Sequence, residues 1–150
     1  MKKDKLEIVS PTIGNTMLCE GLNRSGQVIF QNNKEKGFWD NERNVGELLM
    51  LVTSELGEAM EAHRKGHFAK MDIYEATKEK YFANIDTSAK NVIATTTFQS
   101  CIKDSFEDKI ADAVIRLLDL SAGLGIDLEK HINYKVQYNK GREKLHGKLY

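Results

Sequence analysis

Proline is almost absent from this chain of 150 residues, in which Pro11 stands alone. Because proline breaks helices, long uninterrupted helices are allowed over nearly the whole sequence. Apolar runs are short as well. None reaches the roughly 18 residues of a membrane-spanning helix, and no apolar segment follows the basic residues at the start as it would in a signal peptide. We therefore expect neither a membrane span nor secretion.

The chain also has few cysteines and no net charge. The two cysteines, Cys19 and Cys101, match no metal-ligand spacing, which argues against a disulfide framework or a thiolate metal centre. Basic and acidic residues both number 22, so the formal charge is zero. This balance argues against bulk electrostatic attraction to nucleic acid or to an anionic membrane. The expectation is a cytoplasmic protein with neither partner.

The residues that are present favour helices. A chain that is 41% hydrophobic and 29% charged suits one globular domain, residues 1–150. Because alternating strand patterns with hairpin turns are lacking, the sequence predicts an all-α fold, most simply an antiparallel bundle of four or five helices. We expect an extended lead-in over residues 1–14 and an inserted helix or a mobile excursion over residues 67–96.

Capping residues and glycines indicate where helices begin and end. The Thr95–Thr97 run favours an extended or capping segment instead. The expected helices are residues 16–37, residues 44–65 with Asp40 or Asn44 as the cap, a stretch from 98 or 106 to 124, and a last one from 127.

Residues 44–65, NVGELLMLVTSELGEAMEAHRK, form the most informative stretch. Their apolar side chains recur at three- and four-residue steps, as in a helix with one buried face. At roughly 100° per residue, Glu55 falls inside the apolar sector and Glu58 at its edge. An ionised carboxylate taken out of water costs several kcal/mol unless a positive charge compensates it. Glu55 therefore points toward the core or a cavity, and a cation is expected beside it.

A second acidic stripe lies in the helix that ends at residue 124, where Asp108, Asp112 and Asp119 share one face of an otherwise apolar segment. Two acids 5 to 6 Å apart repel by roughly 3 kcal/mol at an effective dielectric near 20, so a cluster of four requires a counter-ion. Magnesium prefers oxygen ligands and is typically shared between carboxylates and substrate phosphates. The lysine-rich segment after His131 would also bind phosphate oxygens, so this pattern fits metal-assisted attack of water on a polyphosphate.

Four blocks of sequence carry a family resemblance. They are GFWD with RN from Gly37, SELGEAMEAHRKG from Ser54, FEDKIADAVIRLLDL from Phe106, and KVQYNKGR with HGK from Lys135. In this order they resemble the MazG-like branch of the all-α nucleoside triphosphate pyrophosphohydrolases, over most of residues 16–150 except 67–96. The resemblance implies hydrolysis of a nucleoside triphosphate to the monophosphate and pyrophosphate by a metal-activated water, a house-cleaning role in the nucleotide pool, and a site completed in a homodimer or homotetramer.

The family signature is Glu-x-x-Glu followed one helix later by Glu-x-x-Asp, and its acids hold Mg²⁺ or Mn²⁺. Glu55 and Glu58 match the first half, and Asp112 matches the end of the second. Lys109 stands where the third acid is expected, and Asp108, one turn before Asp112, could replace that acid. The resemblance thus implies Glu55 and Glu58 as catalytic residues. The implied metal ligands are Glu55, Glu58, Asp108 and Asp112.

Other matched residues would bind the substrate. Trp39 would stack on the base, since every base offers a π face. Either Glu58 or Glu61 would accept the proton of the water. The residues that would hold the phosphates or the ribose are Lys135, Tyr138, Asn139 and Arg142.

Lys109 leaves three alternatives open. The site binds fewer metals, Lys109 contacts phosphate directly, or activity is impaired and the protein is a nucleotide-binding or interaction protein on the same bundle. Asp108 could also be an early-helix acid if Ser105 is the cap. A di-iron or di-manganese bundle is disfavoured because it needs Glu-x-x-His, whereas Glu58 and Glu61 stand three residues after Glu55 and Glu58.

Overall fold

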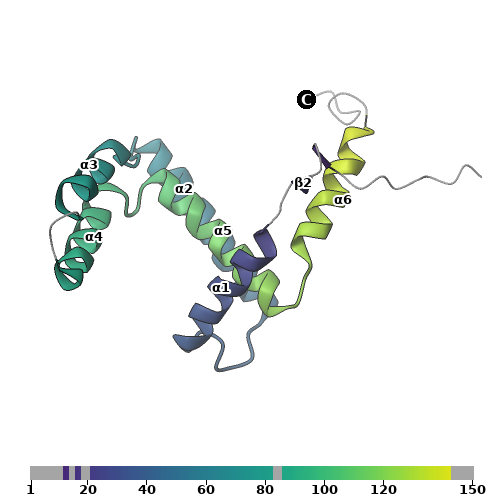
Figure 1. Ribbon diagram of the computed structural model, residues 1–150. Helices are drawn as coiled ribbons and strands as arrows, with labels where there is room; N and C mark the ends of the chain where they lie inside the picture. Colours follow the sequence, from purple (N-terminus) through teal and green to yellow (C-terminus); the bar gives the residue numbers. More distant parts are fainter. Residues whose placement is uncertain (1–11, 14–15, 18–20, 83–85, 143–150) are drawn as a thin grey trace, which may run out of the picture. The chain divides into compact units, whose positions relative to one another are not determined.

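The computed structural model describes residues 12–13, 16–17, 21–82 and 86–142. Most of them are helical, which confirms the all-α fold class (Figure 1). Two short strands, β1 (Thr12–Ile13) and β2 (Thr16–Met17), pair in antiparallel fashion. No helix in these ranges is long and apolar enough to cross a membrane. The helices are α1 Leu22–Glu35, α2 Val45–Arg64, α3 Met71–Phe82, α4 Thr87–Cys101, α5 Phe106–Gly123 and α6 Leu128–Lys140.

The chain divides into two compact units, which we describe separately. The terminal unit consists of residues 1–38 and 118–150, and the 39–117 unit lies between them in the sequence. Helix α5 contributes to both, since the division falls between Leu117 and Leu118. The acidic signature up to Asp112 therefore belongs to the 39–117 unit, and helix α6 belongs to the terminal unit.

Helix α2 is the central helix expected from the sequence. The Asn44 side chain accepts hydrogen bonds from the Gly46 N–H at 2.7 Å and the Glu47 N–H at 3.3 Å, so Asn44 rather than Asp40 caps the helix. The predicted inward orientation of Glu55 is confirmed, because this side chain is buried. The other buried residues of α2 are Leu48, Val52, Ala59 and Ala62.

Helices α3 and α4 account for most of the region that the sequence left open, and they pack against each other. Thr95–Thr97 lie inside α4, so the expectation of an extended or capping segment was wrong. The Thr96 hydroxyl donates to the Val92 carbonyl at 2.9 Å from within the helix. Asp86 caps α4 by accepting two backbone N–H bonds, at 2.8 and 3.0 Å. Packing against α3 and this cap outweigh the weak preference of threonine for extended backbone.

Aromatic rings join the end of α2 to the start of α5. The ring of His63 lies 5.8 Å from that of Phe68 and 5.3 Å from that of Phe106, measured between centroids. The Phe106 N–H donates to the His67 carbonyl at 2.9 Å. These contacts hold the first turn of α5 against the last turn of α2, and α5 begins at Phe106 rather than at Phe98.

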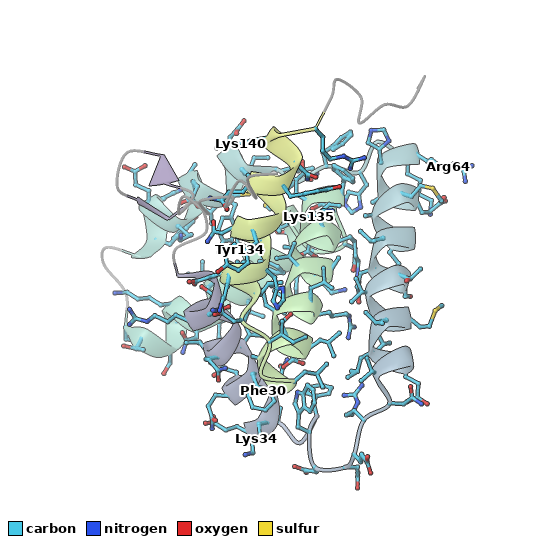
Figure 2. The ribbon with its side chains drawn as sticks, turned by 90° about the vertical axis from the view of Figure 1, so that its right-hand side faces the viewer. Phe30, Lys34, Arg64, Tyr134, Lys135 and Lys140 are labelled. Atoms are coloured by element: carbon cyan, nitrogen blue, oxygen red, sulfur yellow. The ribbon has the colours of Figure 1, made fainter. Side chains whose placement is uncertain are left out.

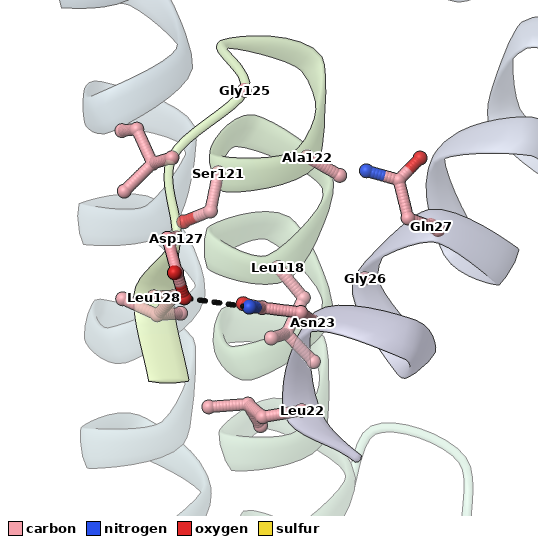
Figure 3. A pocket seen from close by; sticks show the side chains of 11 residues that line it. Leu22, Asn23, Gly26, Gln27, Leu118, Ser121, Ala122, Gly125, Asp127 and Leu128 are labelled. Carbon is pink, nitrogen blue, oxygen red and sulfur yellow. Dashed lines mark hydrogen bonds between the residues drawn. The ribbon is translucent and has the colours of Figure 1, made fainter. Parts of the chain in front are cut away.

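In the terminal unit, Asn23 connects α1 to the start of α6 (Figure 3). Its Nδ2 donates to Asp127 Oδ1 at 2.8 Å, and its backbone N–H donates to Glu129 Oε1 at 2.8 Å. Asp127 also accepts from the Lys130 N–H at 3.1 Å, which confirms Asp127 as the cap of the last helix. A cavity of about 210 Å³ lies beside this connection (Figure 3).

Helix α1 begins later than the sequence suggested. Thr16 lies in β2, and Gly21 has a φ of 90°, a left-handed conformation that a right-handed helix cannot contain. The start near Thr16 was therefore wrong, and Leu22 is the first residue of the helix. Most of the predicted lead-in, residues 1–14, lies outside the described residues.

Gly26 allows α1 to approach the terminal part of α5, because a Cβ at this position would lie 3.2 Å from the Leu118 carbonyl oxygen. A Cβ at Gly57, in α2, would meet no atom within 4 Å. We expect Gly26→Val to lower the free energy of unfolding by about 1–3 kcal/mol. Gly57→Val is the matched control and should change it by about 0.5 kcal/mol or less. Urea unfolding measures both, and equal effects would contradict the close approach.

Candidate functional site

Four carboxylates in the 39–117 unit surround one ammonium group. Lys109 Nζ lies 2.7 Å from Glu58 Oε2, 3.4 Å from Glu55 Oε2, 3.5 Å from Asp104 Oδ1 and 3.6 Å from Asp112 Oδ2. The Lys109 side chain is only 13% exposed. We call these five residues the Lys109 cluster. It joins α2 to α5, which lie antiparallel to each other (Figure 1).

Glu55 has a second cationic partner in α5. Arg116 donates from both Nε and Nη2 to Glu55 Oε1, at 2.9 and 2.8 Å. The two oxygens of Glu55 are thus divided between Arg116 and Lys109. A buried carboxylate requires such compensation, and here two side chains of the chain itself provide it. The sequence indicated the need for a cation but did not identify Arg116.

Asp104 is the member of the cluster that the sequence did not suggest. It lies in the turn between α4 and α5 with a φ of 61°, a left-handed conformation that aspartate tolerates better than most residues. Its Oδ2 lies 2.8 Å from Lys103 Nζ, and its Oδ1 faces Lys109. The signal in the sequence was an aspartate directly before Ser105, the possible cap of α5.

Asp108, a predicted metal ligand, takes part in the start of α5. Its Oδ2 accepts from the Asp104 N–H at 2.8 Å, and its own N–H donates to the Ser105 hydroxyl at 3.3 Å. Ser105 is fully buried. These bonds match the helix-start alternative that the sequence had left open. Asp108 therefore positions the turn that carries Asp104 toward Lys109.

The charged groups of the cluster shift one another's pKa values. Burial alone would raise the pKa of Glu55, but the hydrogen bond from Arg116 and the charge of Lys109 outweigh burial and lower it. The pKa of Asp112 is raised, first by burial and then by the charges of Asp108 and Glu55. The pKa of Lys109 is raised well above its ordinary value, mainly by its hydrogen bond to Glu58. Lys109 is thus firmly protonated.

A cavity of about 230 Å³ opens beside the cluster. Acidic and basic side chains both line it, so it could accept a ligand that carries a metal ion and phosphate. Its lining residues are Glu58, Glu61, Ala62, Lys65, His67, Asp104 and Lys109.

The predicted substrate residues Lys135, Tyr138 and Asn139 lie on α6 and Arg142 directly after it, all in the terminal unit. The ring of Tyr138 lies 5.0 Å from Lys135 Nζ and 5.7 Å from the guanidinium of Arg142. Figure 2 shows Lys135 on this helix. Tyr138 is 62% exposed, and among the described residues the buried Oδ1 of Asn139 has no hydrogen-bond partner. Trp39 is half-buried in the link before α2, within the 39–117 unit.

The carboxylates around Lys109 are suitable ligands for magnesium, which the resemblance implies, but the lysine ammonium occupies the place that the ion would take. All four groups around Lys109 are carboxylates, the ligands that magnesium prefers. They stand at 2.7–3.6 Å from an ammonium nitrogen, which occupies their common centre as a stand-in cation. As the side chains stand, no three His, Cys, Asp or Glu residues in the described ranges are grouped to hold a metal ion. Lys109 has to withdraw before an ion can enter.

Comparisons of the chain with protein-family models, curated proteins and solved structures find no match. The family resemblance therefore stays a prediction from the four sequence blocks, and the chemistry of the chain has to follow from the site itself.

The opposite pKa shifts of Asp112 and Glu55 predict opposite effects of two variants on stability. A raised pKa means that the folded protein binds the Asp112 proton more tightly than the unfolded chain does. The free energy of unfolding therefore falls as the pH rises from the ordinary pKa of 3.8 through the raised pKa of the folded protein. We expect Asp112→Asn to raise the free energy of unfolding at pH 7, modestly because the side chain is 41% exposed. The gain should shrink as the pH is lowered toward the ordinary value of 3.8.

Glu55 has a lowered pKa, so its contribution is present above its ordinary value of 4.5 and is lost as the pH falls through the lower folded value. Glu55→Gln should therefore lower the free energy of unfolding at pH 7, by about 2 kcal/mol. Urea unfolding between pH 4 and pH 7 tests both variants, and changes of the same sign would contradict the assignment.

Proposed function

We propose that the chain is a metal-dependent nucleoside triphosphate pyrophosphohydrolase that converts a nucleoside triphosphate and water to the monophosphate and pyrophosphate. One observation carries the proposal: carboxylates from two helices and a turn converge on a single cationic centre. Lys109 and Glu55 in this cluster are 54 residues apart in the sequence. Acids gather in this way where they share a cation, and magnesium bound by carboxylates is a common centre for phosphate chemistry.

Glu55, Glu58 and Asp112 would hold the magnesium ion, which when bound supplies an activated water and neutralises phosphate charge. The two hydrogen bonds from Arg116 to Oε1 hold the orientation of Glu55 and favour its ionised form. Either Glu58 or Glu61, which both line the cavity, would accept the proton of the water. The oxygens of Glu61 pair with Arg64 and Lys65, at 3.2 and 3.3 Å, and Glu58 pairs with Lys109 at 2.7 Å.

Substrate recognition is assigned to aromatic and cationic groups. Lys135 and Arg142, which both approach the Tyr138 ring, are suited to phosphate oxygens, and Asn139 would hold the phosphates or the ribose. Trp39 would stack on the base. Stacking does not depend on the identity of the base, so specificity must come from other contacts.

We further propose that the helices form an antiparallel bundle and that the site is completed in a homodimer or homotetramer. Exposed apolar side chains on two helices support this. On α2, Leu49, Leu56 and Met60 lie at steps of seven and four and share a face, with 47%, 49% and 62% of each exposed. On α5, Ile110 and Val114 are also exposed. Exposed apolar side chains that share one helix face are typical of interfaces.

A second candidate function rests on Lys109 itself. Its ammonium holds the place of the cation, so the protein could be a nucleotide-binding or interaction protein on the same scaffold, without metal-dependent turnover. The two candidates differ in turnover, not in the arrangement of the helices.

Pyrophosphate release from a panel of canonical and modified nucleoside triphosphates tests the first proposal. We expect release that requires Mg²⁺ or Mn²⁺ and falls by about a hundredfold or more in Glu55→Gln. Glu47→Gln, the same change at an exposed acid of α2 outside the cluster, is the matched control and should keep full activity. Equal activity in both variants would contradict the proposed site.

Lys109→Glu separates the two candidates, because it restores the acid of the family signature. The nucleotide-binding function is supported if the natural protein binds nucleotide in equilibrium dialysis without turnover and the Lys109→Glu variant does turn it over. Turnover in the natural protein that Lys109→Glu leaves unchanged or raises supports the enzyme. Neither binding nor turnover in either protein would reject both candidates.

A further inference from the structure

We propose that Lys109 is a tethered competitor of the divalent metal: its ammonium blocks the carboxylate site until a metal ion displaces it into the adjoining cavity. The proposal rests on the proposed function and assigns a regulatory role to a residue that departs from the family signature. Lys109 thereby sets the metal affinity of the site.

The geometry makes the two cations mutually exclusive. An ammonium group donates three hydrogen bonds, and Lys109 Nζ has four carboxylates within 3.6 Å. Each of these carboxylates directs an oxygen toward the same point. A metal ion that used Glu55, Glu58 and Asp112 would occupy that point, so the ammonium must leave it.

The charge balance favours exchange for a more highly charged ion. The four carboxylates of the cluster face three cations, Lys109, Arg116 and Lys103, so one negative charge remains in excess. Replacing a single positive charge by a divalent ion at the same centre reduces that excess. Arg116 contacts Glu55 at Oε1, whereas Lys109 contacts it at Oε2, so Arg116 can remain in place during the exchange.

The cavity offers the displaced side chain a destination. Lys109 already lines it together with Lys65 and His67. Four methylene groups allow the lysine ammonium to move while its backbone stays fixed in α5. In its new position Lys109 would join two other basic side chains, an arrangement suited to the phosphate oxygens of a polyphosphate that arrives with the metal.

Titration with Mn²⁺ alone, followed by the electron paramagnetic resonance of the free ion, tests the competition independently of turnover. We expect Lys109→Met to bind Mn²⁺ about tenfold or more tightly than the natural protein. Lys103→Met is the matched control: Lys103 also pairs with Asp104, at 2.8 Å, but on the outer side of the cluster. This control should change the affinity by no more than about twofold, through general electrostatics alone.

Equal affinities in the natural protein and Lys109→Met would overturn the proposal. A rise of the same size in Lys103→Met, or no Mn²⁺ binding to any of the three proteins, would also overturn it.

If Lys109→Met does not fold, the natural protein provides a second measurement. Reductive methylation of Lys109, followed by mass spectrometry, should be slow without metal and several-fold faster with Mn²⁺. Unchanged methylation would then reject the competition. Turnover is not used here, so a failure of the proposed enzymatic function would be seen separately.

Discussion

The burial of Glu55 between α2 and α5 is the constraint on which the 39–117 unit depends. A carboxylate that is 7% exposed destabilises a helix interface unless positive charge accompanies it. Arg116 and Lys109 provide that charge from the facing helix, at different oxygens. Because each cation is specific to one side of the carboxylate, the pairing also fixes the register of the two helices. The same contacts therefore stabilise the interface and form the candidate site.

The turn before α5 determines where Lys109 lies. Buried Ser105 caps the helix, and Asp108 holds the backbone of Asp104 in its left-handed conformation. The aromatic contact of Phe106 with His63 holds the same turn against the end of α2. Lys109 follows one turn later and is thus directed at the acids of α2. The position of one lysine thus depends on hydrogen bonds and ring contacts that do not involve Glu55, Glu58 or Asp112.

Residues with a strong local signal were predictable from the sequence, and residues that depend on distant partners were not. Asn44 and Asp127 have short side chains that cap helices locally, so the sequence named Asp127 as the cap of α6 and Asn44 as one of two candidates, with Asp40, for α2. The helical wheel placed Glu55 inward because burial follows the period of a helix. It could not identify Arg116, since a wheel gives the direction of a side chain but not the element it meets.

The errors have the same physical origin. Thr95–Thr97 carry a local preference for extended backbone, but packing against α3 decided their conformation. Asp104 was overlooked because its role arises from a left-handed turn that no periodic pattern reveals.

Under the proposed function, Lys109 supplies the cluster with a central cation when no metal is bound. With an acid at this position, the cluster would gain another negative charge and lose its central cation, and each close pair of acids would repel by roughly 3 kcal/mol. Such a cluster would be stable only with an ion bound, as in many metal sites. A lysine removes that dependence, but under the proposed metal binding it would also weaken the affinity for metal, because the same carboxylates cannot bind both cations. Folding stability without metal and affinity for metal are therefore opposed at a single residue.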